Sequence, residues 1–176
     1  MNNELLKIGK RMSYLLRHNP EDLKMDENGW VDIDDLLKKL DTTFDVIKEI
    51  VDTNDKKRFA YNSNMTKIRA SQGHTIDVDL KLKEVEPPLF LYHGTSPTFI
   101  NAILCSGGLN KMERNHVHLS SNEITAHQVG KRHSKYLEPT ILKIESGKMY
   151  KDGYKFYLSE NNVWLTDHVP NKYIRT

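Results

Sequence analysis

The chain opens with apolar residues at helical spacing. Between Glu4 and His18 they recur three and four positions apart, which predicts an amphipathic helix with one buried stripe. The stripe consists of Leu5, Ile8, Met12, Leu15 and Leu16. Asn19-Pro20 ends the helix, because proline disfavours a helical conformation in the residue before it.

Two further helices follow a short strand predicted at Trp30-Val31. Residues 32–40 begin with acidic side chains suited to capping and continue with helical spacing. Thr42 and Asp45 form a weak capping box that would open a third helix. That helix would bury Phe44, Ile47, Ile50 and Val51.

A hairpin completes the first half of the chain. The runs 58–61 and 67–70 flank Asn62-Ser63-Asn64, a combination typical of two strands joined by a turn. Three helices followed by a hairpin indicate a winged helix.

A proline pair then interrupts the pattern. Residues 75–82 alternate polar and apolar side chains, which predicts either a half-buried strand or an extended connection. Pro87-Pro88 lacks two amide donors and fixes φ, so we place the domain boundary here. The expected division is 1–84 for the first lobe, 85–88 for a linker and 89–176 for the second lobe.

The second lobe is predicted to be α+β and rich in strands. Its strands are expected at 89–92, 116–119, 140–144, 155–158 and 163–165. One helix would start at Ser96-Pro97 and end before Gly107-Gly108. Another would be capped by Ser120 and Glu123 and run towards His133.

Composition narrows the class of protein. Of the 176 residues, 38% are hydrophobic and 28% charged, which is typical of a soluble globular chain. The net charge of +2 excludes a polybasic nucleic-acid binder, so any RNA contact must be a local patch. A single cysteine, Cys105, excludes internal disulfides and a cysteine-rich zinc site. The sequence shows neither a signal peptide nor a membrane span, and a cytoplasmic location is expected.

Four cationic side chains from distant segments are the first candidates for chemistry. Arg17, His18, Arg58 and Arg114 would suit a site for a dianionic phosphate, because guanidinium pairs bidentately with phosphate oxygens. Each also has a simpler interpretation. Arg17-His18 ends a helix, where a cation complements the dipole, and the other two arginines lie in polar segments that are usually solvated.

The histidines are the second set of candidates. His93-Gly94-Thr95 at a strand end would let a ligand approach the backbone while the imidazole and the hydroxyl bind ribose oxygens. As a tripeptide it is very common. His116-x-His118 on a strand could hold a metal, but no HExxH, CxxC or nearby acidic pair accompanies it. No GxGxxG or GxxxxGK[ST] motif occurs, so neither a Rossmann fold nor a P-loop is supported.

Six short sequence motifs, spread along nearly the whole chain, resemble those of one family. LLRH, KKRF, IRASQGH, LYHGT, HVHLS and NNVWLT occur in the order found in the NAD-dependent RNA 2′-phosphotransferases of the KptA type. The resemblance implies an N-terminal winged-helix lobe, a C-terminal lobe with the ADP-ribosyltransferase fold, and a site between them. The expected partners are RNA with a 2′-phosphate and NAD, and a monomer without membrane association is expected.

The resemblance assigns roles to individual residues. Catalytic roles fall on Arg17, His18, Arg58 and Arg114, and binding of NAD falls on His93, Gly94, Thr95, His118 and Ser120. Arg69 is a second candidate for the guanidinium of the hairpin, although it matches a different block. The loop at 106–111 departs slightly from the family pattern, which puts the position of Arg114 in question.

The implied reaction removes a splice-junction 2′-phosphate from RNA in two steps. The phosphate attacks the nicotinamide ribose of NAD, and the ribose O2″ then attacks phosphorus, which yields ADP-ribose 1″,2″-cyclic phosphate. Fixed guanidiniums would stabilise the charge on the phosphoryl oxygens, so no metal is expected.

Two other functions stay open at the level of the sequence. One is an ADP-ribosyltransferase that modifies terminal phosphates or proteins. The other is a non-catalytic winged helix that binds nucleic acid, which would need a basic recognition helix. The segment 41–52 is acidic instead, with four carboxylates and one lysine, and this disfavours duplex binding through it.

Overall fold

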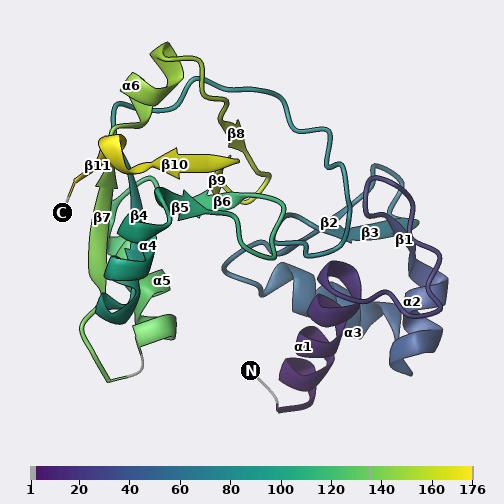
Figure 1. Cartoon of the computed structure of the whole chain (residues 1–176). Coiled ribbons are helices and arrows are strands. Elements are labelled where there is room, and N and C mark those ends of the chain that lie inside the picture. Colours follow the sequence, from purple (N-terminus) through teal and green to yellow (C-terminus); the bar gives the residue numbers. More distant parts are fainter. Residues whose placement is uncertain (1–2, 135, 176) are drawn as a thin grey trace. The chain divides into compact units, whose positions relative to one another are not determined.

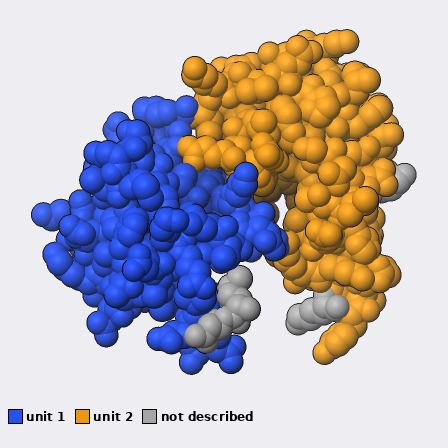
Figure 2. Space-filling view, turned by 180° about the vertical axis from the view of Figure 1, so that it is seen from behind, with its two compact units in different colours: residues 1–81 blue, residues 82–176 orange. Residues whose placement is uncertain are grey.

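The computed structural model describes residues 3–134 and 136–175. The chain divides into two compact units, Met1–Lys81 and Leu82–Thr176 (Figures 1 and 2). Each unit has its own cluster of buried apolar side chains. Within the described ranges, no helix has the length and apolar character needed to cross a membrane.

Unit 1 combines three helices with a small antiparallel sheet. The helices are α1 (Asn3–Arg17), α2 (Ile33–Leu40) and α3 (Phe44–Asp52). The strands are β1 (Val31–Asp32), β2 (Phe59–Tyr61) and β3 (Lys67–Ala70), in the order β1-β3-β2. Met12, Leu15 and Leu16 of α1 are fully buried, as the apolar spacing predicts, and the hairpin is confirmed.

Capping at the two short helices of unit 1 agrees with the sequence only in part. The side chain of Asp32 accepts a hydrogen bond from the backbone N–H of Asp34, so the predicted acidic cap of α2 is confirmed. The predicted capping box of Thr42 and Asp45 is wrong, because Thr42 still belongs to the end of α2. Its N–H donates to the carbonyl of Leu37, and Thr43 occupies the N-cap position of α3 without a side-chain hydrogen bond.

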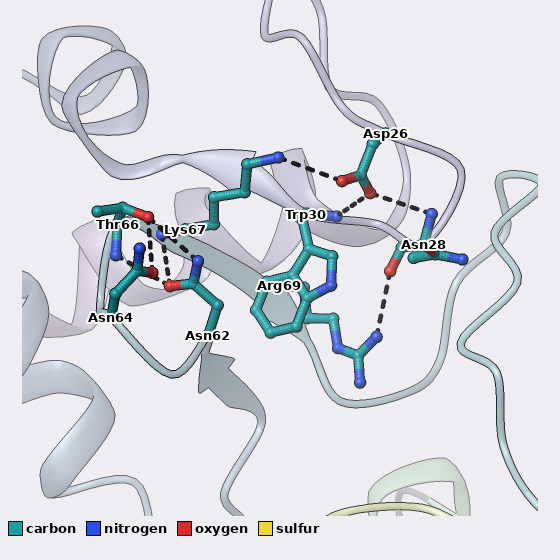
Figure 3. A network of polar contacts seen from close by, with 8 residues as sticks. All are labelled: Asp26, Asn28, Trp30, Asn62, Asn64, Thr66, Lys67 and Arg69. Atoms are coloured by element: carbon teal, nitrogen blue, oxygen red, sulfur yellow. Dashed lines mark hydrogen bonds and ion pairs between the residues drawn. The ribbon is translucent and has the colours of Figure 1, made fainter.

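A network of asparagine and aspartate side chains shapes the loops around the hairpin (Figure 3). Asp26 Oδ1 accepts hydrogen bonds from the N–H groups of Asn28 and Trp30, which fixes the turn before β1. Asn62 Oδ1 accepts from the N–H groups of Thr66 and Lys67 and closes the hairpin turn. These contacts explain why short polar residues interrupt the apolar pattern at both places.

The segment 75–82 is a connection and not a strand. Val78 is buried, whereas Thr75, Asp77 and Asp79 are exposed, so the alternation of burial follows the sequence. The segment forms no ladder with a named strand, and its hydrogen bonds to distant parts of unit 1 are single contacts. Asp79 bonds with the loop before β1 through its N–H to the carbonyl of Glu27 and through its own carbonyl, which accepts from Asn28 Nδ2.

Unit 2 contains three small antiparallel sheets and three α-helices. Its strands are β4 (Leu91–Thr95), β5 (Gly108–Asn110), β6 (Val117–Leu119), β7 (Thr140–Ile144), β8 (Tyr157–Leu158), β9 (Trp164–Thr166), β10 (His168–Pro170) and β11 (Ile174–Arg175). The strand orders are β11-β7-β4, β6-β9-β8 and β10-β5. A bridge between Tyr92 and Ser120 joins the end of β6 to β4.

The helices of unit 2 are α4 (Ile100–Cys105), α5 (Glu123–Ser134) and α6 (Ser146–Lys151), with 3₁₀ turns at Pro97–Phe99 and Asn171–Tyr173. Helix α5 packs on β4 and β7 (Figure 1). The contact is close because two glycines face each other. A Cβ on Gly94 would lie 1.8 Å from the carbonyl oxygen of Ala126, and one on Gly130 would lie 2.6 Å from Pro139 Cβ.

Several predicted elements of unit 2 are shifted or missed. The first strand lies at 91–95 and not at 89–92. The predicted cap of α5 by Ser120 is wrong, because Ser120 is engaged in the bridge to Tyr92, and Asn122 Oδ1 accepts the N–H of Thr125 instead. The elements β5, β10, β11 and α6 were not predicted, since each is only two to six residues long.

Candidate active site

The end of α1 presents the first pair of candidate residues, Arg17 and His18. The N–H of Thr75 donates to the carbonyl of Arg17 at 2.9 Å, and Thr75 Oγ1 lies 3.0 Å from His18 Nδ1. The helix end and the segment after β3 are therefore joined by a main-chain bond and a side-chain bond. His18 is held at one ring nitrogen, and Thr75 is a positioning residue that the sequence analysis did not identify.

A buried histidine lies beside this pair. His74 has only 2% of its surface exposed, and its Nε2 atom lies 3.5 Å from where a Cβ on Gly29 would be. Burial, together with the charges of Arg17, Arg69 and His18, lowers the pKa of His74 from 6.5 to about 4. His74 is therefore neutral at pH 7, and the space around it has a positive potential, which favours an anion.

The third guanidinium of this region belongs to Arg69. Its Cζ atom lies 4.4 Å from the centre of the Trp30 ring, and Nη1 donates to the carbonyl of Asn28 at 3.4 Å (Figure 3). Arg69 is 8% exposed. Stacking fixes the plane of the guanidinium, and its charge acts on His74. Arg69, the second candidate for the guanidinium of the hairpin, thus belongs to the cluster around His74.

Arg58 is placed by the start of the hairpin. Its carbonyl accepts a hydrogen bond from the N–H of Ser71 at 2.9 Å, and its Nη1 contacts Asn54 Oδ1 at 3.5 Å. Ser71 precedes His74 by three residues. Arg58 and the segment that carries Thr75 are therefore anchored at the same end of the β2-β3 ladder.

Unit 2 brings Arg114 and His118 into direct contact. Arg114 Nη1 lies 2.7 Å from His118 Nδ1. Because a guanidinium can only donate, His118 Nδ1 must accept, so this imidazole is neutral and carries its proton on Nε2. The loop that departs from the family pattern therefore still delivers Arg114 to the strand β6.

His93 lies next to this pair. Its Nδ1 donates to the carbonyl of His118 at 3.0 Å, which leaves the lone pair of the neutral ring on Nε2. Burial lowers the pKa of His93, the hydrogen bond to His118 opposes that effect, and the charges of His133 and Arg114 add to it. His93 is therefore an acceptor at Nε2, and His118 is a donor at Nε2.

The remaining candidates of unit 2 have mixed outcomes. Thr95 lies two residues beyond His93 on the same face of β4 and is buried. Ser120 is joined to Tyr92, the neighbour of His93, by two backbone hydrogen bonds. Gly94 lies at the helix contact, where α5 takes the space that a side chain would fill.

The candidates thus form two groups, one in each unit. Arg17, His18, Arg69 and His74 gather in unit 1, and His93, Arg114 and His118 gather in unit 2, with Ser120 alongside. Across residues 3–134 and 136–175, no group of three or more His, Cys, Asp or Glu side chains is arranged to hold a metal ion. The alternative of a metal at His116 and His118 finds no third ligand there, and the ring of His116 packs on Tyr157 instead.

Permanent cations around a neutral imidazole, together with two imidazoles of fixed tautomer, are features of a protein that handles phosphate and hydroxyl groups. Comparison with known proteins agrees with this class. The chain matches the model of the family described as RNA 2'-phosphotransferase, Tpt1 / KptA family, over residues 3–168. The chain belongs to this family.

Individual relatives cover the full length. The chain is 53% identical to a "Probable RNA 2'-phosphotransferase" of Flavobacterium johnsoniae, over 99% of this chain and 98% of the relative. It is 48% identical to a protein of the same description from Fusobacterium nucleatum, over 99% of both chains. A third, from Hahella chejuensis, is 47% identical over 99% of this chain and 95% of the relative.

Proposed function

We propose that this protein removes a 2′-phosphate from RNA and transfers it to NAD, as an NAD-dependent RNA 2′-phosphotransferase. The observation that carries the proposal is the contact of Thr75 with both Arg17 and His18, in a chain that belongs to the RNA 2′-phosphotransferase family. The substrate is a splice-junction 2′-phosphate of the kind found in tRNA. The protein acts as a monomer.

The finer fold classes belong to the same proposal. Unit 1 has the element order of a winged helix, in which β2 and β3 form the wing. Unit 2 is an ADP-ribosyltransferase-like lobe, supported by its small antiparallel sheets and by α5 across β4.

Unit 1 supplies groups suited to the phosphate. The guanidinium of Arg17 and the positive potential around His74 favour a dianion, and Arg58 adds a further cation from the hairpin. The guanidiniums stabilise the negative charge that builds on the phosphoryl oxygens when phosphorus is attacked. His18, which Thr75 holds at one nitrogen, moves or orients a proton near pH 7.

Unit 2 supplies groups suited to NAD. The lone pair on His93 Nε2 accepts a hydrogen bond from a ribose hydroxyl, and His118 Nε2–H donates one to an oxygen acceptor. Thr95 and Ser120 offer hydroxyl groups beside them. These neutral groups fit a nucleotide sugar, whereas Arg114 adds the charge needed at the phosphoryl group.

The reaction balances in two steps. In the first, an oxygen of the 2′-phosphate forms a bond to C1″ of the ribose, and nicotinamide leaves with the electron pair of the broken C–N bond. In the second, O2″ attacks phosphorus and loses its proton, and the RNA 2′-oxygen leaves and takes up a proton. The products are RNA with a 2′-hydroxyl, ADP-ribose 1″,2″-cyclic phosphate and nicotinamide.

One assay tests the proposal. Purified protein is incubated with NAD and one of three oligonucleotides, which carry an internal 2′-phosphate, a terminal phosphate or no phosphate beyond the backbone. We expect nicotinamide release with the 2′-phosphorylated oligonucleotide alone. Release driven by the terminal phosphate would instead identify an ADP-ribosyltransferase, and no release with any of the three would leave a nucleic-acid-binding protein.

A further inference from the structure

The helices of unit 1 differ in charge. Helix α3, which would be the recognition helix of a winged helix, carries three carboxylates and one lysine, and that Lys48 pairs with Asp52. Helix α2 carries two aspartates in its first turn and two lysines in its last, so its charges balance. Helix α1 carries Lys7, Lys10 and Arg11 ahead of Arg17, with Glu4 as its one acidic residue. The positive surface of unit 1 that suits RNA is therefore on α1.

Three of the basic residues at this end of unit 1 and one tyrosine form a line along α1. Lys7, Arg11, Tyr14 and His18 are spaced by four, three and four residues, so they lie on one face of the helix. All four are exposed, and the buried residues of α1 lie on the opposite face. At a rise of 1.5 Å per residue the line is roughly 16 Å long.

An aromatic ring lies within the line. Tyr14 is 43% exposed, with the guanidinium of Arg11 5.6 Å from its ring centre and the centre of the His18 ring 6.0 Å away. An exposed aromatic ring beside cations is the arrangement that proteins use to stack an unpaired base and contact its phosphates. A tyrosine that served only the core of unit 1 would be buried.

The Arg11 guanidinium is held in place by a carboxylate. Arg11 Nη2 donates to Glu21, which also accepts from Lys39, and these hydrogen bonds, that of Lys39 first, lower the pKa of Glu21. The ion pair fixes Arg11 over Tyr14 and offsets part of its charge. Lys7, one turn before Arg11, adds positive charge at the far end of the line, and Lys10 adds charge next to Arg11.

We propose that the exposed face of α1 formed by Lys7, Lys10, Arg11 and Tyr14 binds the unpaired RNA strand next to the nucleotide whose 2′-phosphate is removed. Tyr14 stacks a base, and the three cations contact backbone phosphates. This inference rests on the proposed function, because it takes His18, at the end of the same line, and its neighbour Arg17 as the groups that meet the 2′-phosphate.

Binding is measured without NAD, by fluorescence anisotropy of labelled single-stranded RNA. One oligonucleotide is a 2′-phosphorylated dinucleotide, and a second has six more nucleotides around the same site. A third is the longer one without the 2′-phosphate. The variants are Tyr14→Ala and the double variant Lys7→Ala/Lys10→Ala. Tyr136→Ala, an exposed tyrosine of unit 2, and Lys38→Ala/Lys48→Ala, exposed lysines of α2 and α3, are the matched controls.

The wild-type protein is expected to bind the longer RNA more tightly than the dinucleotide. Tyr14→Ala should weaken binding of the longer RNA about tenfold and leave the dinucleotide unaffected. The double lysine variant should reduce the slope of log affinity against log salt by about 1.4, which is about 0.7 for each backbone phosphate that a lysine no longer neutralises. The control variants should match the wild type.

Equal wild-type affinity for both lengths would overturn the inference, and so would losses of the same size in the control variants. The third oligonucleotide separates this inference from the proposed function. If the α1 face binds RNA, the longer RNA without the 2′-phosphate still loses affinity in Tyr14→Ala. That result holds whether or not NAD is consumed in the assay of the proposed function.

Discussion

Both units contain a histidine whose pKa is lowered by burial, but they surround that ring differently. In unit 1, His74 lies among the charges of Arg17, Arg69 and His18, which add to the effect of burial. In unit 2, His93 donates to the backbone of His118. The first arrangement creates a positive potential, and the second fixes which nitrogen donates and which accepts.

This difference separates two kinds of recognition. An anion is held by charges that do not titrate, and a sugar hydroxyl is held by neutral groups of known direction. Unit 1 has the first character and unit 2 mainly the second. Arg114 is the exception, since it adds a permanent charge to the neutral pair of unit 2.

The largest effect is expected at Gly94, where the lack of a side chain lets α5 pack closely on β4 in unit 2. Gly94→Ala would push a methyl group to 1.8 Å from the carbonyl of Ala126, so unit 2 should lose at least about 3 kcal/mol of stability. The matched change in unit 1 is Gly9→Ala in α1, where the new Cβ meets Ile50 at 3.4 Å. It should stabilise by about 0.5–1 kcal/mol, since alanine favours helix. Urea unfolding followed by circular dichroism measures both, and a mild effect at Gly94 would contradict the close helix contact.

The next largest effect is expected from Arg114, the permanent charge beside the neutral histidines of unit 2. Arg114→Ala should slow the attack on phosphorus about a hundredfold, or roughly 3 kcal/mol, with a smaller effect on nicotinamide release. The ADP-ribosylated 2′-phosphate should then accumulate, and Arg58→Ala should behave alike. Radiolabelled 2′-phosphorylated RNA resolved by electrophoresis shows the species. Slow loss of substrate without the intermediate would assign both arginines to binding or to the first step.

The buried histidine of unit 1 makes stability depend on pH. Its pKa of about 4 lies below the ordinary value of 6.5, so the unfolded chain binds more protons and stability falls as pH decreases from about 6.5 to about 4. Between pH 7 and pH 5 the loss should be about 2 kcal/mol. Urea midpoints at both pH values, followed by Trp30 emission in a Trp164→Phe background, measure it.

The His74→Gln variant isolates the contribution of this ring. It should show a smaller difference between pH 7 and pH 5 than the parent protein, whatever its absolute stability. An unchanged pH difference would mean that other groups cause the effect. His93 acts in the same direction in unit 2, where the Trp164 signal would follow it.

The contact between Thr75 and His18 predicts a smaller effect. Thr75→Val keeps the shape of the side chain and removes the hydroxyl that holds His18 Nδ1, so kcat should fall about tenfold with KM for NAD unchanged. The acidic limb of the pH–rate profile should shift, and Thr75→Ser should restore both. A Thr75→Val enzyme with the wild-type profile would remove Thr75 from the mechanism.

Removal of metal ions is expected to have no effect on activity. If guanidiniums supply the charge stabilisation, as proposed, activity should be retained in EDTA. The assay is nicotinamide release with and without chelator. Loss that only added Zn²⁺ or Mg²⁺ restores would show that the cations of the two units are insufficient.

The sequence predicts much of unit 1 and less of unit 2, for a physical reason. Helix α1 has a long apolar period and the hairpin a polar turn, so local signals are strong there. Strands β5 and β11 are two or three residues long and exist only because a distant strand pairs with them. No local pattern announces such a pairing.

The candidate site shows the same limit. The residue types of Arg17 and His18 suggest phosphate chemistry from the sequence alone, but their link to Thr75 spans 57 residues or more and depends on the tertiary fold. The glycine of LYHGT was expected to admit a ligand, and the structure assigns it to helix packing. Whether the nine predicted residues perform the proposed roles stays a prediction.

The pairing of β11 with β7 has a consequence for how the protein is made. Every strand of unit 1 is complete by Ala70, so its sheet can assemble early in synthesis. The β11-β7-β4 sheet needs Ile174 and Arg175, which are synthesised long after Ala70. At roughly 5–20 residues per second, unit 1 has several seconds to fold before unit 2 can close its sheet. During synthesis, unit 1 can therefore fold while the third strand of the β11-β7-β4 sheet has not yet been made.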